Sequence, residues 1–199
     1  MKKLLVFVIT NVIAINFIGC CKTVDLNIKN FKNQISELKV YGKEESSEII
    51  KILTSCGNNK DLSIDNAIKK NMIVIKNGKM VGNKNLWDNF NKNIKNKKED
   101  SVIIVQYTAQ EDAILIYLSY NKDKFFMIKD ESRDRHREVR DKNYYEYDFK
   151  YMRIFEENNN IYAYLLDDNN ITLDELNYSL ISEDISQWVH YGFIFHINK

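Results

Sequence analysis

The chain has 199 residues, of which 29 are lysine or arginine and 28 are aspartate or glutamate, so its formal net charge is only +1. This balance argues against a basic surface for nucleic acid, and we expect no nucleic-acid partner. Apolar residues make up 44% of the chain and aromatic residues 12%, which excludes a disordered chain and is typical of one folded domain.

A basic and then apolar leader opens the sequence. Lys2 and Lys3 precede a short apolar run over residues 4–18, which contains two asparagines and ends just before Gly19. A membrane-spanning helix needs about 20 predominantly apolar residues. The shorter run therefore predicts an export signal rather than a transmembrane helix.

The junction Phe17-Ile18-Gly19-Cys20 resembles the lipobox of bacterial lipoproteins. The resemblance implies cleavage before Cys20 and a diacylglycerol on its sulfur. Each buried methylene contributes about 0.8 kcal/mol, so two acyl chains anchor stably where a single chain binds reversibly. We therefore expect a signal peptide over 1–19, a tether over 20–33 and a folded domain over 34–199. The lipid on Cys20 would hold this domain at the extracytoplasmic face of the cell membrane.

The first half of the chain alternates helical and strand patterns. Apolar residues recur at near-helical spacing over 46–55, and Cys56-Gly57 can end that helix. Asn77-Gly78 is the preferred pair for a two-residue type I′ turn, which predicts a hairpin between strands at 72–76 and 80–81. Two further helices are expected over 63–70 and 85–98.

Strand patterns dominate from residue 101 onward. The run 101–108 is almost entirely apolar and β-branched, which predicts a central strand buried on both faces. Residues 113–120 alternate and turn into a strand over 124–129. We expect these strands to place Val102, Ile104 and Ile114 in the core. The other expected strands are 145–156, 161–166 and 190–197.

A capping box is predicted from Thr172 and Glu175, and it opens a helix that carries Leu173, Leu176 and Leu180. Consecutive strands joined by short turns favour antiparallel pairing. The pattern as a whole predicts an α+β fold: a single domain whose antiparallel sheet is covered on one face by about three helices.

Several short segments resemble an uncharacterised family of Gram-positive bacterial lipoproteins, the domain of unknown function 4362 family. They are Val105-Gln106-Tyr107-Thr108, Glu111-Asp112 and Asp130-Glu131-Ser132-Arg133-Asp134, and Ala67-Ile68-Lys69, Asn77-Gly78 and residues 86–90 precede them in the same order. The resemblance covers about 63–199. It implies the lipoprotein location and supplies no activity, since none of these motifs is a catalytic signature.

The densest polar cluster of the chain lies at residues 130–141. Its arginines lie near a histidine and could bind a phosphate, a carboxylate or an anionic wall polymer through bidentate contacts. Arg133 and Asp134 are the first candidates because they lie in the family-like segment, and Arg135 and Arg137 follow. Acidic residues alternate with the basic ones, so local pairing in a solvated loop is the alternative.

No metal site and no cofactor are predicted. The acidic run Asp167-Asp168-Asn169-Asn170 lacks the Gly and Glu that an EF-hand needs downstream, which favours a turn before a helix. His190 and His196 flank the last strand without further ligands nearby. Cys21 and Cys56 could form a disulfide, or both could stay unpaired thiols.

The sequence does not name a reaction. We expect an anchored binding module that recognises a wall component, a peptide or a partner protein. The alternative is a cell-surface hydrolase whose acid and base come from Glu111, Asp112 or Asp134. Two carboxyl groups within about 5–10 Å in a concave pocket would favour the hydrolase, whereas a shallow exposed surface would favour binding.

Overall fold

The computed structural model describes residues 42–138 and 143–199, which belong to one compact unit, Lys39–Lys199. The expected signal peptide, the tether and Cys20 lie outside the described residues. Within the described ranges, every helix is too short or too polar to cross a membrane.

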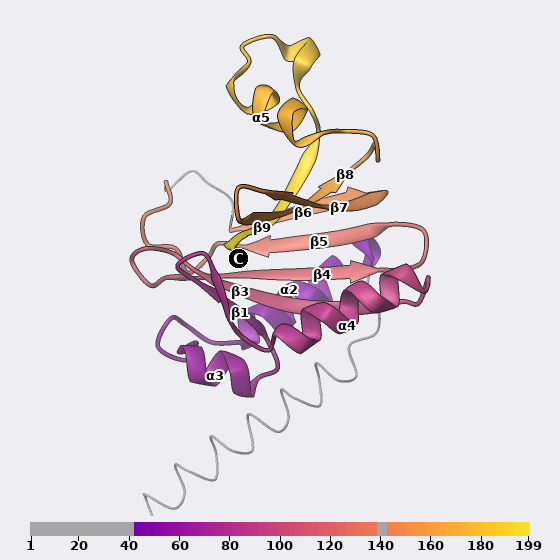
Figure 1. The fold of residues 1–199 in the computed structure, drawn as a ribbon. Helices are drawn as coiled ribbons and strands as arrows, with labels where there is room; N and C mark the ends of the chain where they lie inside the picture. Colours follow the sequence, from indigo (N-terminus) through magenta and orange to yellow (C-terminus); the bar gives the residue numbers. More distant parts are fainter. Residues whose placement is uncertain (1–41, 139–142) are drawn as a thin grey trace, which may run out of the picture. The chain divides into compact units, whose positions relative to one another are not determined.

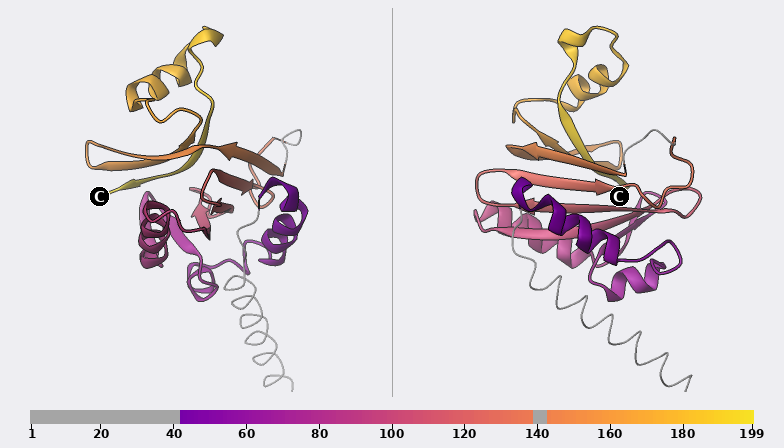
Figure 2. Two further views of the ribbon diagram at one scale, coloured as in Figure 1. Left: turned by 90° about the vertical axis from the view of Figure 1, so that its right-hand side faces the viewer. Right: turned by 180° about the vertical axis from the view of Figure 1, so that it is seen from behind.

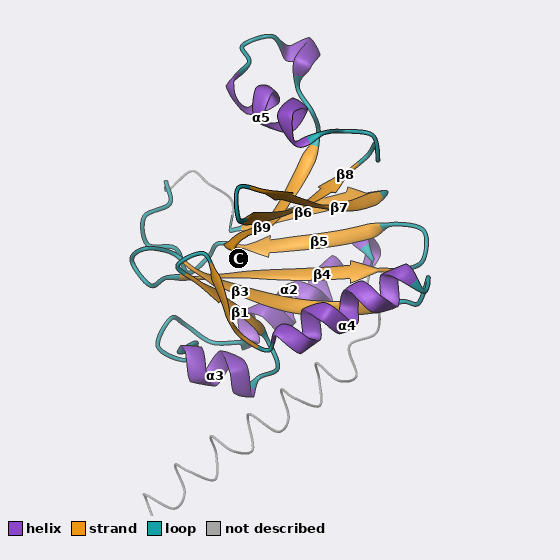
Figure 3. Cartoon of the chain, in the orientation of Figure 1, coloured by secondary structure: helices purple, strands orange, loops and turns teal. Residues whose placement is uncertain are grey.

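Helices and strands alternate along the described residues, which confirms a mixed α and β fold (Figures 1 and 3). In chain order the elements are η1 (Lys43–Glu45), α2 (Ser46–Ser55), α3 (Ile64–Lys69), β1 (Ile73–Lys76), β2 (Lys79–Gly82), α4 (Lys84–Lys95), β3 (Asp100–Tyr107), β4 (Ala113–Tyr120), β5 (Phe125–Asp130), β6 (Tyr144–Phe149), β7 (Tyr151–Glu157), β8 (Asn160–Leu166), α5 (Leu173–Ile181), η2 (Ile185–Gln187) and β9 (Tyr191–Asn198).

The strands form two sheets rather than one. The larger has the order β2-β1-β3-β4-β5-β6, and the smaller has the order β7-β8-β9. All pairings are antiparallel except that of β1 with β3, which is parallel. The expectation of a purely antiparallel sheet was therefore wrong at this pair. The β1–β2 hairpin is followed by α4, and this crossover returns the chain beside β1 in the same direction.

The hairpin turn is confirmed. Asn77 and Gly78 both have positive φ angles, 51° and 67°, as a type I′ turn requires. By contrast, the strand expected over 145–156 is two strands. It breaks at Lys150, and β6 and β7 belong to different sheets.

Both faces of the larger sheet are buried, and different elements cover them. One face carries Ile104, Leu118 and Met127, and it packs against α4 and against the smaller sheet. Helix α2 contacts β4 and β5 and lies on the other side of the sheet from α4 (Figure 2). The expectation that the helices cover a single face was therefore wrong. Three consecutive residues of β3, 103–105, are buried, so each face needs its own apolar partner.

The three residues expected in the core are buried to different degrees. Ile104 is fully buried, while Val102 and Ile114 are half-buried on the same face. Ile104 lies between Ile73 of β1 and Ile116 of β4, its partners in the two neighbouring strands. It is therefore the centre of the packed face.

Between β8 and β9 the chain leaves the smaller sheet to form α5 and η2. We call residues 167–190 the α5 arm. The predicted capping box is confirmed: the Glu175 N–H donates to Thr172 Oγ1 at 3.2 Å, and the Thr172 N–H donates to Glu175 Oε2 at 2.7 Å. Leu173 and Leu176 of α5 pack on Tyr164 and Leu166 of β8, which fixes the start of the helix against the sheet.

Candidate functional site

Arg133, the first ligand-binding candidate, is built into the fold. Its side chain is only 7% exposed. Nε donates to the carbonyl of Gly57 at 2.6 Å and Nη2 donates to the carbonyl of Leu53 at 2.7 Å, while Nη1 pairs with the fully buried Asp130. The last carbonyls of a helix lack intrahelical donors. The Arg133 guanidinium therefore holds the C-terminal end of α2 to the strand β5.

Asp112 is the second buried carboxylate of this region. Asn59 Nδ2 donates to it at 2.7 Å, and the backbone N–H and Nε of Arg135 donate at 3.1 and 2.8 Å. Burial alone raises the pKa of Asp112, but the hydrogen bonds and charge of Arg135 outweigh burial and leave the pKa below its usual value. Asp112 is thus an ionised anchor for the loop, and its pKa shift is opposite to the one a general acid needs.

The remaining loop candidates differ in exposure. Arg135 has the most exposed side chain of the four, at 69%, with Nη2 3.3 Å from the carbonyl of Gln110. Asp134 is half-buried and accepts the backbone N–H of His136, and Arg137 is also half-buried. The structure therefore brings Arg135 onto Asp112 but turns Arg133 inward, so the four residues do not form one shared surface.

Glu111 lies at a cavity of about 540 Å³ that Tyr107 and Lys76 also line. Lys76 Nζ donates to Glu111 at 2.5 Å, and this hydrogen bond lowers the pKa of Glu111. The Tyr107 hydroxyl donates to the carbonyl of Leu62 at 2.6 Å, and burial raises the pKa of Tyr107 to about 12. Neither Glu111 nor Asp112 has the raised pKa of a general acid, and Asp134 does not line this cavity.

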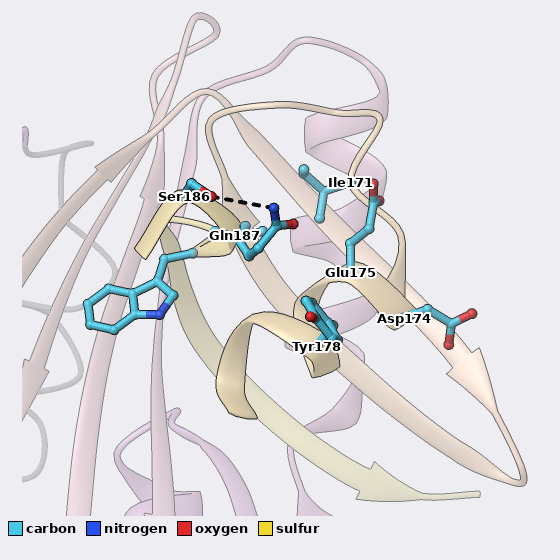
Figure 4. Close-up of a pocket in the computed structure, with 8 residues that line it drawn as sticks. Ile171, Asp174, Glu175, Tyr178, Ser186 and Gln187 are labelled. Atoms are coloured by element: carbon cyan, nitrogen blue, oxygen red, sulfur yellow. Dashed lines mark hydrogen bonds between the residues drawn. The ribbon is translucent and has the colours of Figure 1, made fainter. Parts of the chain in front are cut away.

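A second hollow, of about 420 Å³, lies between α5 and η2 in the α5 arm. Figure 4 shows Tyr178 of α5, Gln187 of η2 and Ile171 among the side chains that line it. Trp188 also lines the hollow. The hollow is a groove on a small lobe whose own apolar centre is the Leu173–Leu176 contact with β8.

Exposed apolar side chains are concentrated in the α5 arm, and two of them, Tyr178 and Trp188, line this groove. In the described part of the chain, five of the eight large apolar side chains that are exposed belong to the α5 arm: Tyr178, Leu180, Ile181, Ile185 and Trp188. Ile181 and Ile185 are the most exposed, at 80% and 73%. Scattered single apolar residues are normal on a surface, but a cluster marks an interaction site. The α5 arm is therefore the candidate functional site.

Polar contacts inside the α5 arm hold these side chains in place. The Trp188 indole N–H donates to the carbonyl of Ser182 at 2.9 Å, and the Val189 N–H donates to the buried Ser179 hydroxyl at 2.7 Å. Asp184 caps η2 by accepting the Ser186 N–H at 2.9 Å. Trp188 is thus fixed in orientation while 60% of it stays open to solvent.

Sequence reasoning missed this site. It grouped Leu180 with Leu173 and Leu176 on one helix, but the buried side of α5 continues from Leu176 to Ser179, and Leu180 is exposed. The available signal was Ile181, Ile185 and Trp188, three large apolar residues between the expected helix and the expected last strand.

The other predicted features are local structure. Asp168 accepts the N–H of Asn170 in a turn, and His190 Nδ1 lies 2.8 Å from Asp167. His196 Nε2 lies 3.0 Å from the side-chain oxygen of Asn160. The described ranges contain no group of three side chains suited to a metal ion.

Cys56 is a free and buried thiol, and burial raises its pKa to about 12. Cys21 lies outside the described residues. A thiol with so high a pKa is a poor nucleophile, because the thiolate is the reactive form.

The chain is thus a mixed α/β protein with a lobe of exposed apolar side chains outside its main sheet. A family model described as Domain of unknown function (DUF4362) matches residues 70–164, so this part of the chain is similar to that family. The resemblance to this family seen in the sequence is thereby confirmed over residues 70–164. Comparisons with curated proteins and with solved structures gave no match. The α5 arm begins just after the matched residues.

Proposed function

We propose that this protein is a lipid-anchored binding module at the extracytoplasmic face of the membrane and that the α5 arm is its contact surface for a partner protein. The location is supported by the leader that ends at Cys20. The binding role is carried by one observation, the concentration of exposed apolar side chains in the α5 arm, of which Tyr178 and Trp188 line its groove.

The composition of this surface suits protein recognition. Trp and Tyr are enriched among the residues that dominate binding energy, and here Trp188 and Tyr178 line the same groove. The hydrogen bond from the Trp188 indole to Ser182 exists before any partner arrives. Since less side-chain freedom is lost on binding, such preorganisation strengthens affinity.

Site-specific crosslinking in the intact cell tests the contact surface. A photoreactive amino acid at Ile185 should give a discrete crosslinked adduct, because Ile185 is largely exposed beside the groove. The matched control is the same amino acid at Val81, which is also exposed, at 46%, but lies on β2. Absence of an adduct from Ile185, or the same adduct from both positions, would contradict the proposed surface.

The membrane anchor has its own test. Replacing Cys20 with serine should move the protein out of the membrane fraction or block its processing and should abolish labelling with palmitate, since serine has no thiol to acylate. The Cys21→Ser variant is the matched control, and it should behave as the wild type does. Retention of the Cys20→Ser protein in the membrane with normal processing would refute the anchor.

A further inference from the structure

The α5 arm has a charge as distinctive as its apolar cluster. Residues 167–190 contain no lysine or arginine. They contain six acidic residues: Asp167, Asp168, Asp174, Glu175, Glu183 and Asp184. The whole chain is nearly neutral, with a formal net charge of +1. The negative charge is thus concentrated on the lobe that carries the exposed apolar residues.

Two of these six carboxylates line the groove, and two more precede an exposed apolar residue of the same arm. Asp174 and Glu175 line the groove itself, and Figure 4 shows the Asp174 carboxylate directed away from the ribbon at its edge. Glu183 and Asp184 directly precede the exposed Ile185. All four residues are exposed. A partner in the groove would meet the carboxylates of Asp174 and Glu175 beside its apolar contacts.

Of the four carboxylates just described, two accept capping hydrogen bonds within the arm and two do not. Glu175 caps α5 and Asp184 caps η2, and these hydrogen bonds lower the pKa of each group. Asp174 and Glu183 have no ion-pair partner among the described residues. Both are ready to receive cationic groups from outside.

Resting on the proposed function of the α5 arm, we propose that its partner is a basic amphipathic segment of another protein. Apolar side chains of that segment enter the groove at Tyr178 and Trp188, and its lysine or arginine side chains meet Asp174 and Glu183. Complementary charge suppresses wrong partners and fixes register, while apolar anchors supply affinity.

The same charge disfavours an anionic membrane as the occupant of the groove. Anionic lipid surfaces attract basic segments and repel acidic ones. An exposed tryptophan and isoleucines alone would suit an interfacial membrane contact. Because the arm has no lysine or arginine, the observations favour the protein segment.

A synthetic peptide tests this chemistry. The full-length protein in nanodiscs of zwitterionic lipid is titrated with a fluorescent amphipathic peptide of leucine and lysine, and empty nanodiscs give the background. The peptide should bind and should weaken as salt is raised, because exposed charge pairs are screened. A peptide with glutamate in place of lysine should not bind.

Paired charge variants locate the binding. The double variant Asp174→Asn/Glu183→Gln should bind the basic peptide about tenfold more weakly, the ratio expected when two exposed ion pairs are lost. The matched control, Asp65→Asn/Glu157→Gln, removes the same two charges from exposed residues outside the arm and should bind as the wild type does. Circular dichroism and thermal melting confirm that both variants fold.

The outcomes separate the two proposals. A crosslinked adduct at Ile185 in cells without binding of the basic peptide would overturn the basic partner and leave the contact surface standing. Equal binding of the lysine and glutamate peptides, or an equal loss in both double variants, would also overturn it. A blue shift of Trp emission on phosphatidylglycerol vesicles that is lost in Trp188→Phe would show that a membrane occupies the groove instead.

Discussion

Replacing Arg133 with alanine should lower the free energy of unfolding by about 3–5 kcal/mol, the cost of breaking a buried ion pair by removing one partner. The substitution leaves the fully buried Asp130 without its countercharge. It also removes the donors to the carbonyls of Leu53 and Gly57, so the end of α2 loses its attachment to β5. Urea denaturation of the purified protein measures the change.

Two further variants show what the guanidinium contributes. Arg133→Lys keeps the charge but not the planar fork, so it should recover only part of the loss. Arg135→Ala should cost less than Arg133→Ala, because Arg135 is largely exposed and Asp112 keeps the hydrogen bond from Asn59. If Arg133→Ala were as stable as the wild type, Arg133 would have no structural role and would return as a candidate for binding a ligand.

Truncating Ile104 to alanine should cost about 2–5 kcal/mol, the range for removing a buried branched side chain and leaving a cavity. Ile104 is fully buried between its strand neighbours Ile73 and Ile116. Its face also packs against α4 and the smaller sheet, so three layers meet at this position and little collapse into the cavity is expected.

The matched control for Ile104 is Val81→Ala on β2. Val81 is exposed, and a surface change of this kind usually stays within about 0.5 kcal/mol of the wild type. Chemical denaturation of both variants gives the comparison. Equal stabilities for Ile104→Ala and Val81→Ala would show that the three layers do not meet at Ile104.

Local chemistry determined much of this fold. The Asn77-Gly78 turn needs two positive φ angles, and the residue types that tolerate them are visible in the sequence. The Thr172 and Glu175 cap depends on residues three apart, and the burial of Ile104 follows from a continuous apolar strand. The leader that ends at Cys20 is likewise a continuous pattern, and the predicted location rests on it alone.

Contacts between residues that are far apart in the sequence determined the remaining features of the structure. The Arg133 guanidinium donates to carbonyls 76 and 80 residues earlier in the chain. Because no local spacing encodes that pairing, the sequence analysis grouped Arg133 with Arg135 and Arg137 as a ligand-binding candidate. The parallel partner of β1 depends on where α4 returns the chain. The candidate site depends on which side of α5 is covered: Leu173 and Leu176 meet β8 and Ser179 is buried, whereas Leu180 is exposed. Periodicity shows which residues of a helix can share a face, but only tertiary packing determines which of them are covered.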